Sequence, residues 1–98
     1  MKNELDKILP QIRLLLPYIR HKYQVNSIEV FGSYVRKEQT IGSDLDLLVS
    51  FNNIPGLIKF IELKNYLTDQ LQLNVDLVMK DALKPRLSQN ILSESIPI

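Results

Sequence analysis

The sequence predicts a small α/β domain of the α+β kind, in which a mixed β-sheet carries helices packed on one face. Segments with the apolar spacing of helices alternate along the chain with segments of strand-like alternation. Their order is helix, strand, short helix, strand, helix, strand, helix, which is typical of a sheet covered by helices. The 98 residues match the usual size of one hydrophobic core, so we expect a single domain over residues 1–98.

The two long helices are expected over residues 3–23 and 55–70. Pro10 and Pro17 interrupt the first segment, and an interior proline removes a backbone hydrogen bond, so we expect two short helices or one kinked helix. Each segment has an apolar stripe at intervals of three and four residues. The expected stripes are Leu5, Ile8, Ile12, Leu15 and Ile19 in the first, and Leu57, Phe60, Ile61, Leu63 and Leu67 in the second.

Three strands are expected, over residues 27–31, 44–51 and 73–80. Successive side chains of a strand point to opposite faces of the sheet. Asp44 and Asp46 of the second strand and Asp76 of the third therefore lie opposite the apolar residues of their own strands. We expect these aspartates on a face of the sheet that forms a cleft open to solvent.

The remaining elements are short. Residues 33–38 are expected to form a short helix that opens at Ser33, a residue type common at helix N-caps. The chain after residue 80 is expected to hold a short helix after Pro85 and then a tail. The apolar end of this tail, "SIPI", is expected either to contact a partner protein or to pack on the core of this domain.

Composition excludes several classes of function. Twelve basic and eleven acidic residues give a net charge of +1, so the chain has no general attraction for nucleic acid or an anionic membrane. It has no cysteine, and therefore neither disulfides nor a thiolate metal site. The N-terminus carries acidic residues where a signal peptide would be basic, and no apolar stretch is long enough to cross a bilayer. We expect a cytoplasmic protein that does not bind nucleic acid directly.

The paired aspartates indicate a metal site. Asp44 and Asp46 stand two residues apart on one strand face, roughly 6.6–6.8 Å along the chain. Two such carboxylates repel each other unless cations lie between them, and Mg²⁺ is bound through one or two carboxylates together with substrate phosphates. Asp76 is the natural third ligand of a two-metal site. The alternative is that Asp44 closes a turn and that Asp76 is a solvated charge at a strand end.

The pair Gly32-Ser33 indicates a phosphate-binding turn. Glycine lets the backbone approach a phosphate closely, and a helix that begins at Ser33 presents free N–H groups to it. Arg36, one turn later, would lie near the same phosphates, whereas Lys37 is interpreted as a solvated charge. The alternative is an ordinary turn from a strand into a helix.

Together these residues resemble a known family. Gly32-Ser33, ten residues and then Asp44-x-Asp46 match the signature of the DNA polymerase β-like nucleotidyltransferase superfamily. The stretch "FGSYVRKEQTIGSDLDLLVSF" is similar to the minimal nucleotidyltransferase (MNT) family, whose members typically read F-G-S-Y-A-R-G-E and then S-D-I-D-L-L-V. The later "VDLV" and the ending "LKPRLSQNILSESIPI" extend the resemblance over nearly the whole chain. Lys37 departs from the family by replacing its usual glycine.

The resemblance implies a polymerase β-like nucleotidyltransferase fold and a Mg²⁺-dependent transfer of AMP from ATP to a hydroxyl. It implies that Gly32, Ser33 and Arg36 bind the nucleotide. It also implies that Asp44, Asp46 and Asp76 hold two Mg²⁺ ions and are the catalytic residues.

The partner implied by the resemblance is a HEPN-domain ribonuclease toxin. An MNT protein acts as its antitoxin by adding AMP to a tyrosine of the toxin. Two alternatives stay open: an antitoxin that neutralises by binding alone, and a nucleotidyltransferase that acts on a small molecule or RNA. The short chain and the lack of a basic stripe disfavour the second alternative.

Overall fold

The chain forms four strands and three main helices in a computed structural model that describes residues 4–40, 42–83 and 91–98. In chain order the elements are α1 (Glu4–Tyr23), β1 (Val25–Phe31), α2 (Ser33–Arg36), β2 (Leu45–Phe51), α3 (Leu57–Leu71), β3 (Val75–Met79), the 3₁₀ turn η1 (Lys80–Ala82) and β4 (Ile96–Pro97). Residues 91–94 are also helical. None of the helices in these described ranges is both long and apolar enough to cross a membrane.

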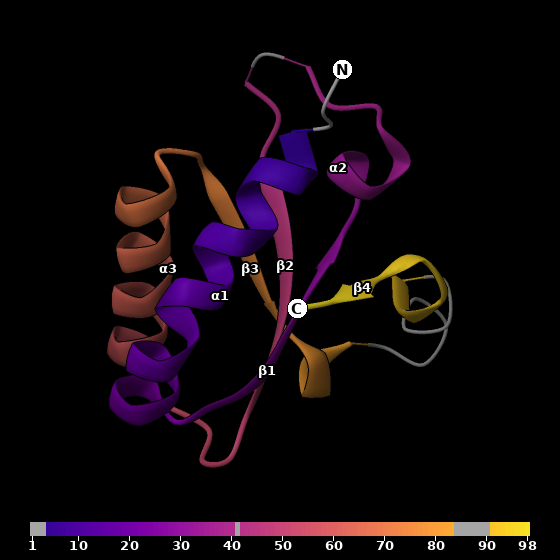
Figure 1. Ribbon diagram of the computed structural model, residues 1–98. Coiled ribbons are helices and arrows are strands. Elements are labelled where there is room, and N and C mark those ends of the chain that lie inside the picture. The colour runs from indigo at the N-terminus through magenta and orange to yellow at the C-terminus, as the bar shows by residue number, and fades with distance from the viewer. Residues whose placement is uncertain (1–3, 41, 84–90) are drawn as a thin grey trace.

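The sheet is mixed, as the sequence predicts. Its strand order is β3-β2-β1-β4, with β2 antiparallel to β1 and parallel to β3, and with β4 antiparallel to β1. Helices α1 and α3 lie side by side on one face, and α2 lies beyond the end of β1 (Figure 1). The parallel pairing of β2 and β3 is possible because α3 carries the chain back across the sheet between them.

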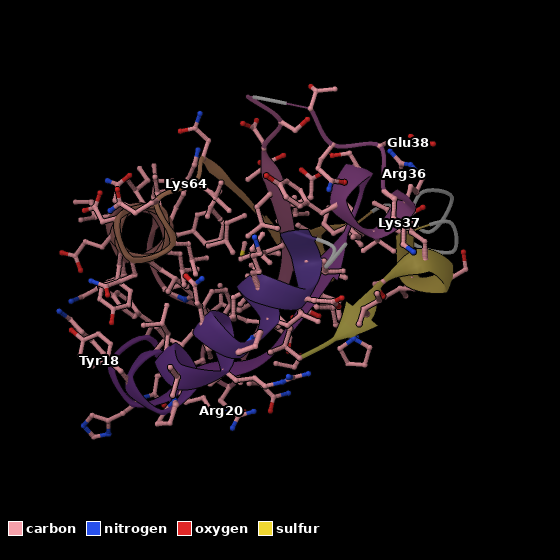
Figure 2. The ribbon with its side chains drawn as sticks, turned by 45° about the horizontal axis from the view of Figure 1, so that its top comes forward. Tyr18, Arg20, Arg36, Lys37, Glu38 and Lys64 are labelled. Carbon is pink, nitrogen blue, oxygen red and sulfur yellow. The ribbon has the colours of Figure 1, made fainter. Side chains whose placement is uncertain are left out.

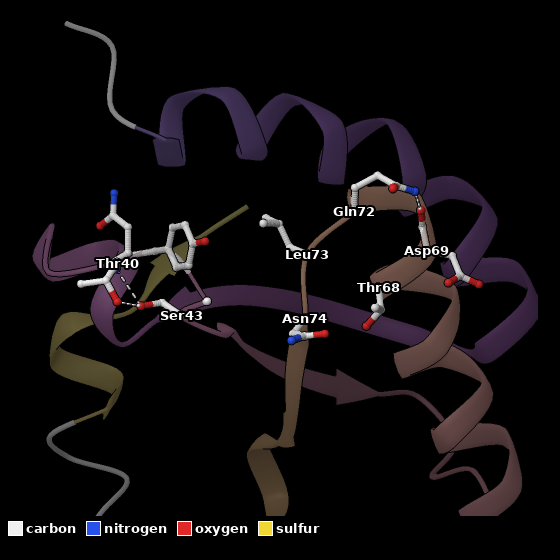
Figure 3. A pocket seen from close by; sticks show the side chains of 10 residues that line it. Thr40, Ser43, Thr68, Asp69, Gln72, Leu73 and Asn74 are labelled. Atoms are coloured by element: carbon white, nitrogen blue, oxygen red, sulfur yellow. Dashed lines mark hydrogen bonds between the residues drawn. The ribbon is translucent and has the colours of Figure 1, made fainter.

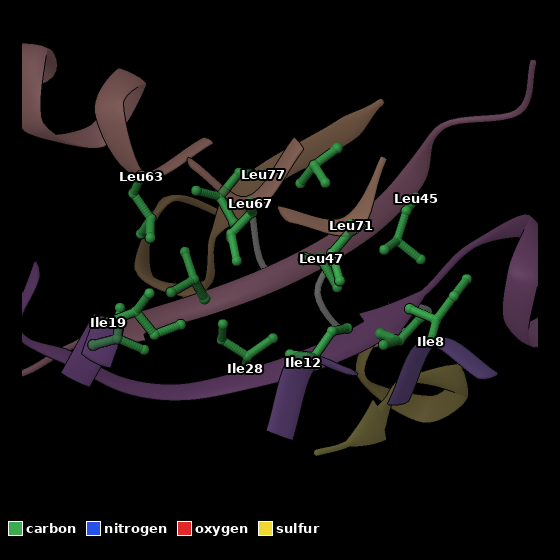
Figure 4. Close-up of a cluster of buried hydrophobic side chains, with 14 of the residues drawn as sticks. Ile8, Ile12, Ile19, Ile28, Leu45, Leu47, Leu63, Leu67, Leu71 and Leu77 are labelled. Atoms are coloured by element: carbon green, nitrogen blue, oxygen red, sulfur yellow. The ribbon is translucent and has the colours of Figure 1, made fainter. Parts of the chain in front are cut away.

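The core lies between this face of the sheet and the two long helices (Figure 4). From the strands it takes the alternating apolar residues, among them Ile28, Val30, Leu45, Leu47, Val49, Val75 and Leu77. Their burial confirms the predicted alternation. Because the pleat has a period of two, burying these residues fixes the aspartates of β2 and β3 on the opposite face.

Helix α1 runs through both of its prolines as one element, so two separate helices do not form. Its buried stripe is Leu5, Ile8, Ile12, Leu16, Ile19 and Tyr23. Leu16 therefore takes the core position expected for Leu15, which is only half-buried. Helical periodicity over 20 residues selects this spacing, since 3.6 residues per turn carries the stripe from Ile12 to Leu16 and then to Ile19.

The stripe predicted for α3 is wrong at its N-terminal end. The helix begins at Leu57, and its buried residues are Leu63, Leu67 and Leu71. Leu57 and Ile61 are 74% and 46% exposed. Phe60 already packs against Phe51 of β2, so the helix contacts the sheet through Phe60, Leu63 and Leu67. Leu57 and Ile61, four residues apart on another side of the helix, remain in solvent.

The second face of the sheet is less open than expected. Asp44 and Asp76 are exposed at one end of it, but Leu48, farther along β2, is only 1% exposed, and η1 contacts β2. The expected strand boundaries also shift: β1 begins at Val25, and β2 begins at Leu45 rather than at Asp44. The predicted helix after Pro85 falls mainly outside the described residues.

The end of the chain packs on this domain. Ile96 pairs with Val30, Pro97 pairs with Glu29, and the Ile98 N–H donates a 3.1 Å hydrogen bond to the carbonyl oxygen of Ile28. Of the two placements expected for "SIPI", the structure therefore has the one in which it packs on its own domain. It does so as an edge strand of the sheet.

Candidate active site

The three predicted carboxylates belong to one end of the sheet. Asp46 lies on β2, opposite Phe31 of β1 on one side and opposite Asp76 of β3 on the other. Asp44 immediately precedes β2, where the N–H of Leu45 donates a 2.8 Å hydrogen bond to the carbonyl oxygen of Asn74. The mixed sheet thus brings together residues that are thirty positions apart in the sequence.

The carboxyl group of Asp46 is electrostatically destabilised as an anion. Its side chain is half-buried, whereas Asp44 and Asp76 are exposed. Burial, followed by the negative charges of Asp76 and Asp44 and a hydrogen bond with Asp76, raises the pKa of Asp46 to about 6; the positive charge of Arg36 opposes this shift. A bound cation would relieve the same repulsion, because it favours the charged form.

Gly32 is required by the geometry of this site. It follows the last residue of β1 and has φ +81° and ψ −152°, a backbone conformation that is essentially restricted to glycine. A Cβ built on Gly32 would overlap Oδ2 of Asp46 and would lie 2.9 Å from its Cγ. The turn that carries Ser33 therefore lies directly against the Asp46 carboxylate.

The role predicted for Ser33 as an N-cap is wrong. Gly32 is the N-cap of α2, and its carbonyl oxygen accepts hydrogen bonds of 3.1 and 3.2 Å from the N–H groups of Val35 and Arg36. Ser33 is the first residue of the helix, and no side chain caps this end. The positive φ of Gly32 turns the chain sharply out of β1, so the helix begins one residue earlier than the serine suggested.

Helix α2 is also shorter than expected, because it ends at Arg36. Lys37 adopts the left-handed conformation, with φ +61°. Members of the MNT family usually have glycine at this position, and glycine adopts such a conformation without steric cost. With lysine at this position the helix still ends in a left-handed residue, but the backbone there is strained.

Arg36 is held by two carboxylates. Its Nη1 lies 3.0 and 3.2 Å from the two carboxylate oxygens of Glu94, and its Nε lies 3.1 Å from Oε2 of Glu38. Figure 2 shows Arg36, Lys37 and Glu38 together at the end of α2, beside the C-terminal segment, with Lys64 on α3 across the molecule. A role for Arg36 in nucleotide binding, and equally for Gly32 and Ser33, stays a prediction.

Two adjoining hollows lie beside the carboxylates. The larger has a volume of about 890 Å³ and lies between Gln39, Thr40, Gly42 and Ser43 on one side and the turn from α3 into β3 on the other (Figure 3). The smaller, of about 330 Å³, is lined by Asp44 and Asp76 and shares Thr68 and Asn74 with the larger. Both are lined mainly by polar residues, which could receive the reacting groups of a substrate.

Sequence reasoning missed three polar residues at this site: Asn74, Thr68 and Glu94. Strand alternation places Asn74, two residues before Asp76, on the same face, but the sequence reasoning gave it no role at the site. Thr68 lies on α3, and its hydroxyl accepts a 3.3 Å hydrogen bond from the N–H of Val75. Glu94 comes from the far end of the chain, and no local pattern connects it to Gly32.

The donor set suits a hard divalent cation, since three carboxylates at one end of a sheet are the oxygen ligands that Mg²⁺ prefers. Across residues 4–40, 42–83 and 91–98, no three His, Cys, Asp or Glu side chains converge closely enough to hold a metal ion. The three aspartates thus fit Mg²⁺ by the chemistry of their oxygens, although their side chains do not converge into a three-ligand site in this structure. Their role as metal ligands stays a prediction.

Comparison with known proteins agrees with this arrangement. Residues 12–98 match the family model of the nucleotidyltransferase domain. The protein adenylyltransferase MntA of Thermococcus cleftensis is 50% identical over 78 residues, which cover 80% of this chain and 79% of that protein. The region matched by the family model includes the Gly-Ser turn and all three aspartates.

Solved structures have the same fold. One that is provisionally described as a minimal nucleotidyltransferase has 35% identity and a TM-score of 0.79, with 94% of each chain covered. A toxin–antitoxin complex with AMP-PNP has 26% identity and a TM-score of 0.70, with 96% of this chain and 71% of the other covered. The chain thus belongs to the nucleotidyltransferase domain family and, within it, to the minimal nucleotidyltransferases.

Proposed function

We propose that this protein is a Mg²⁺-dependent protein adenylyltransferase that transfers AMP from ATP to a tyrosine hydroxyl of a HEPN ribonuclease toxin and thereby acts as its antitoxin. The observation that carries the proposal is the contact of Gly32 with Asp46, beside the pairing of Asp46 with Asp76. It supports a site in which a phosphate-binding turn adjoins carboxylates that repel one another.

The chemistry assigns each residue a part. Gly32, Ser33 and Arg36 would hold the triphosphate, while Asp44, Asp46 and Asp76 would hold two magnesium ions. The ions, when bound, supply positive charge to the entering and leaving oxygens. Because phosphoryl-transfer enzymes act mainly by positioning and electrostatics, these six residues would suffice for the transfer.

The reaction balances without a redox step. The acceptor hydroxyl oxygen forms a bond to the α-phosphorus of ATP, and the bond between that phosphorus and the oxygen bridging to the β-phosphorus breaks. Pyrophosphate leaves, and the hydroxyl proton passes to Asp76 or to water. Asp76 suits this task because it is exposed and lines the smaller hollow, where an acceptor can reach it.

A protein acceptor is supported by the relatives. The Thermococcus protein is named a protein adenylyltransferase, and the 26% identical structure is a toxin–antitoxin complex that contains an ATP analogue. The HEPN toxin itself comes from the resemblance of the Gly-Ser and Asp-x-Asp stretches to the MNT family. ATP and such a toxin would both be met in the cytoplasm, where we propose that the protein acts.

An antitoxin that only binds its toxin is the second candidate, and the state of Asp46 argues against it. Burial and two neighbouring negative charges raise the pKa of Asp46, so the fold carries an electrostatic cost at neutral pH. A binding surface gains nothing from this cost, whereas a metal-dependent site uses it. A small-molecule or RNA acceptor has no comparable support in a chain with a net charge of +1.

The test combines the purified protein, ATP labelled at the α-phosphate, Mg²⁺ and a candidate HEPN-domain partner. We expect label on a tyrosine of the partner, none without Mg²⁺, and none with the Asp44→Asn/Asp46→Asn variant. Co-purification of that variant with the toxin provides the matched control for binding. A stable complex without label from the native protein would instead support neutralisation by binding alone.

A further inference from the structure

The C-terminal segment, residues 92–98, is tied along β1 up to the catalytic turn. Besides the strand pairing of β4, the hydroxyl of Ser95 donates a 2.8 Å hydrogen bond to Oε2 of Glu29, in the middle of β1. Lys80 of η1 contacts the other carboxylate oxygen of Glu29 at 3.5 Å. The strand pairing of β4 places the segment, and with it Glu94, alongside β1; the side-chain contacts of Glu29 add to the attachment.

Glu94 reaches the Gly-Ser turn itself. Its Oε1 accepts hydrogen bonds from the backbone N–H of Gly32, at 3.2 Å, and from Nη1 of Arg36, at 3.0 Å. Its Oε2 accepts a second bond from Nη1 of Arg36, at 3.2 Å. A single carboxylate thus bridges the first and last parts of the turn, and its side chain is only 29% exposed.

This bridge acts where the turn is most constrained. Gly32 lies against the Asp46 carboxylate in a conformation restricted to glycine, so a small displacement of the turn changes the position of Ser33 relative to the carboxylates. Helix α2 has four residues and no side-chain cap, and it is too short to fix its own orientation. The contacts from Glu94 supply an anchor from outside the turn.

We propose that Glu94 is a positioning residue for nucleotide binding, which holds the Gly32-Ser33 turn and the Arg36 side chain in the geometry that receives the triphosphate. The inference rests on the proposed function, because it assumes that this turn binds ATP. It also assigns a purpose to the C-terminal segment: the pairing of β4 with β1 brings Glu94 to the turn. Losing this anchor is expected to weaken nucleotide binding about tenfold, which corresponds to about 1.4 kcal/mol.

The experiment measures binding of a non-hydrolysable ATP analogue, with Mg²⁺, by titration calorimetry, together with KM and kcat for transfer to the HEPN partner. The variants are Glu94→Ala, Glu94→Gln and the matched control Ser95→Ala. The control removes the neighbouring side-chain tie to β1 and leaves the turn untouched. Thermal unfolding of each variant reports the cost to the fold.

For Glu94→Ala we expect Kd and KM for the nucleotide to rise about tenfold, with kcat changed less than about threefold. Glu94→Gln keeps an acceptor for the Gly32 N–H, so it is expected to recover part of the affinity. Ser95→Ala is expected to lower the unfolding temperature by as much as Glu94→Ala does, with Kd unchanged.

Three outcomes would overturn the inference. Equal losses of affinity in Glu94→Ala and Ser95→Ala would make Glu94 a structural residue only. Unchanged affinity in Glu94→Ala, beside clear binding by the native protein, would remove its role at the turn. Tighter binding by Glu94→Ala would mean that the carboxylate competes with the phosphates. If the native protein fails to bind the analogue at all, the proposed function fails as well, so the two failures are distinguishable.

Discussion

The α-carbon of Gly32 lies where any side chain would collide with the carboxylate of Asp46. The two residues come from neighbouring strands, since Phe31, just before Gly32, is the register partner of Asp46. This contact joins the Gly32-Ser33 turn to the central carboxylate of the candidate site. It also makes the glycine necessary for two independent reasons, space and backbone conformation.

Replacing Gly32 by alanine is therefore expected to abolish AMP transfer and to lower the free energy of unfolding by about 3 kcal/mol, from strain and overpacking together. Gly56→Ala is the matched control, because nothing lies within 4 Å of a Cβ at Gly56 and its φ is −69°. Denaturant unfolding and the labelled-ATP assay measure the two effects. A Gly32→Ala protein as stable and active as Gly56→Ala would contradict the contact described above.

Asp46 makes stability depend on pH in a definite direction. Its pKa is raised to about 6 in the folded state, so between pH 4 and 6 the folded protein keeps a proton that the unfolded chain has released. Stability from this group is complete at acid pH and is lost as pH rises through 6. Asparagine carries no charge, so the Asp46→Asn variant is expected to have a free energy of unfolding about 1–2 kcal/mol higher than that of the native protein at pH 7.5. This value is reduced to allow for the partial exposure of the side chain.

The measurement is denaturant unfolding in EDTA at pH 4 and 7.5. The gain from Asp46→Asn is expected at pH 7.5 and should nearly vanish at pH 4. Asp69→Asn, at an exposed carboxylate of α3, serves as the control for a general change of charge. A stabilisation by Asp46→Asn that is the same at both pH values would show that repulsion among the carboxylates is not its cause.

Asp76 is exposed, so its replacement separates function from folding. Asp76→Asn is expected not to lower the free energy of unfolding, because the side chain is exposed and its negative charge repels Asp46. Transfer of AMP is expected to fall more than about 100-fold, because a metal ligand is lost. Asp81→Asn, at an exposed position of η1, is the control that should keep full activity in the labelled-ATP assay. Near-native transfer by Asp76→Asn would remove it from the site.

Lys37 offers a stabilising substitution. Its left-handed conformation costs a non-glycine residue about 1–2 kcal/mol, so Lys37→Gly is expected to raise the unfolding free energy by about 1 kcal/mol after allowance for the flexibility of glycine. Lys37→Ala removes the same side chain and keeps the strain, so it should give no such gain. Equal stability of the glycine and alanine variants in denaturant unfolding would argue against backbone strain at this residue.

The sheet could be predicted from the sequence because strand alternation states which residues must be buried. Leu45, Leu47 and Val49 on one face require Asp46 on the other, and the same holds for Val75 and Leu77 around Asp76. Burial then decides the register, and register brings Asp46 beside Asp76. The positions of Asp46 and Asp76 can thus be predicted from strand alternation together with the Gly-Ser and Asp-x-Asp motif.

Tertiary contacts decided the rest. Leu57 fits a helical stripe but is exposed, because the stripe does not say which side of the helix contacts the sheet. Ser33 has the residue type of an N-cap, yet the turn at Gly32 starts the helix one residue earlier. Glu94 is 62 positions away from Gly32 in the chain, and only the pairing of β4 with β1 brings them together.

The shortness of β4 has a consequence for solvent exchange at the site. This edge strand has two paired positions on β1, and its side-chain tie from Ser95 to Glu29 joins residues 66 positions apart, so it is expected to detach before the rest of the sheet opens. The amide proton of Ile98, bonded to Ile28, and that of Gly32, bonded to Glu94, should then exchange with deuterium at similar rates. Both should exchange faster than the amides that join β1 to β2. The entrance to the nucleotide site would thus loosen repeatedly while the core beneath it stays folded.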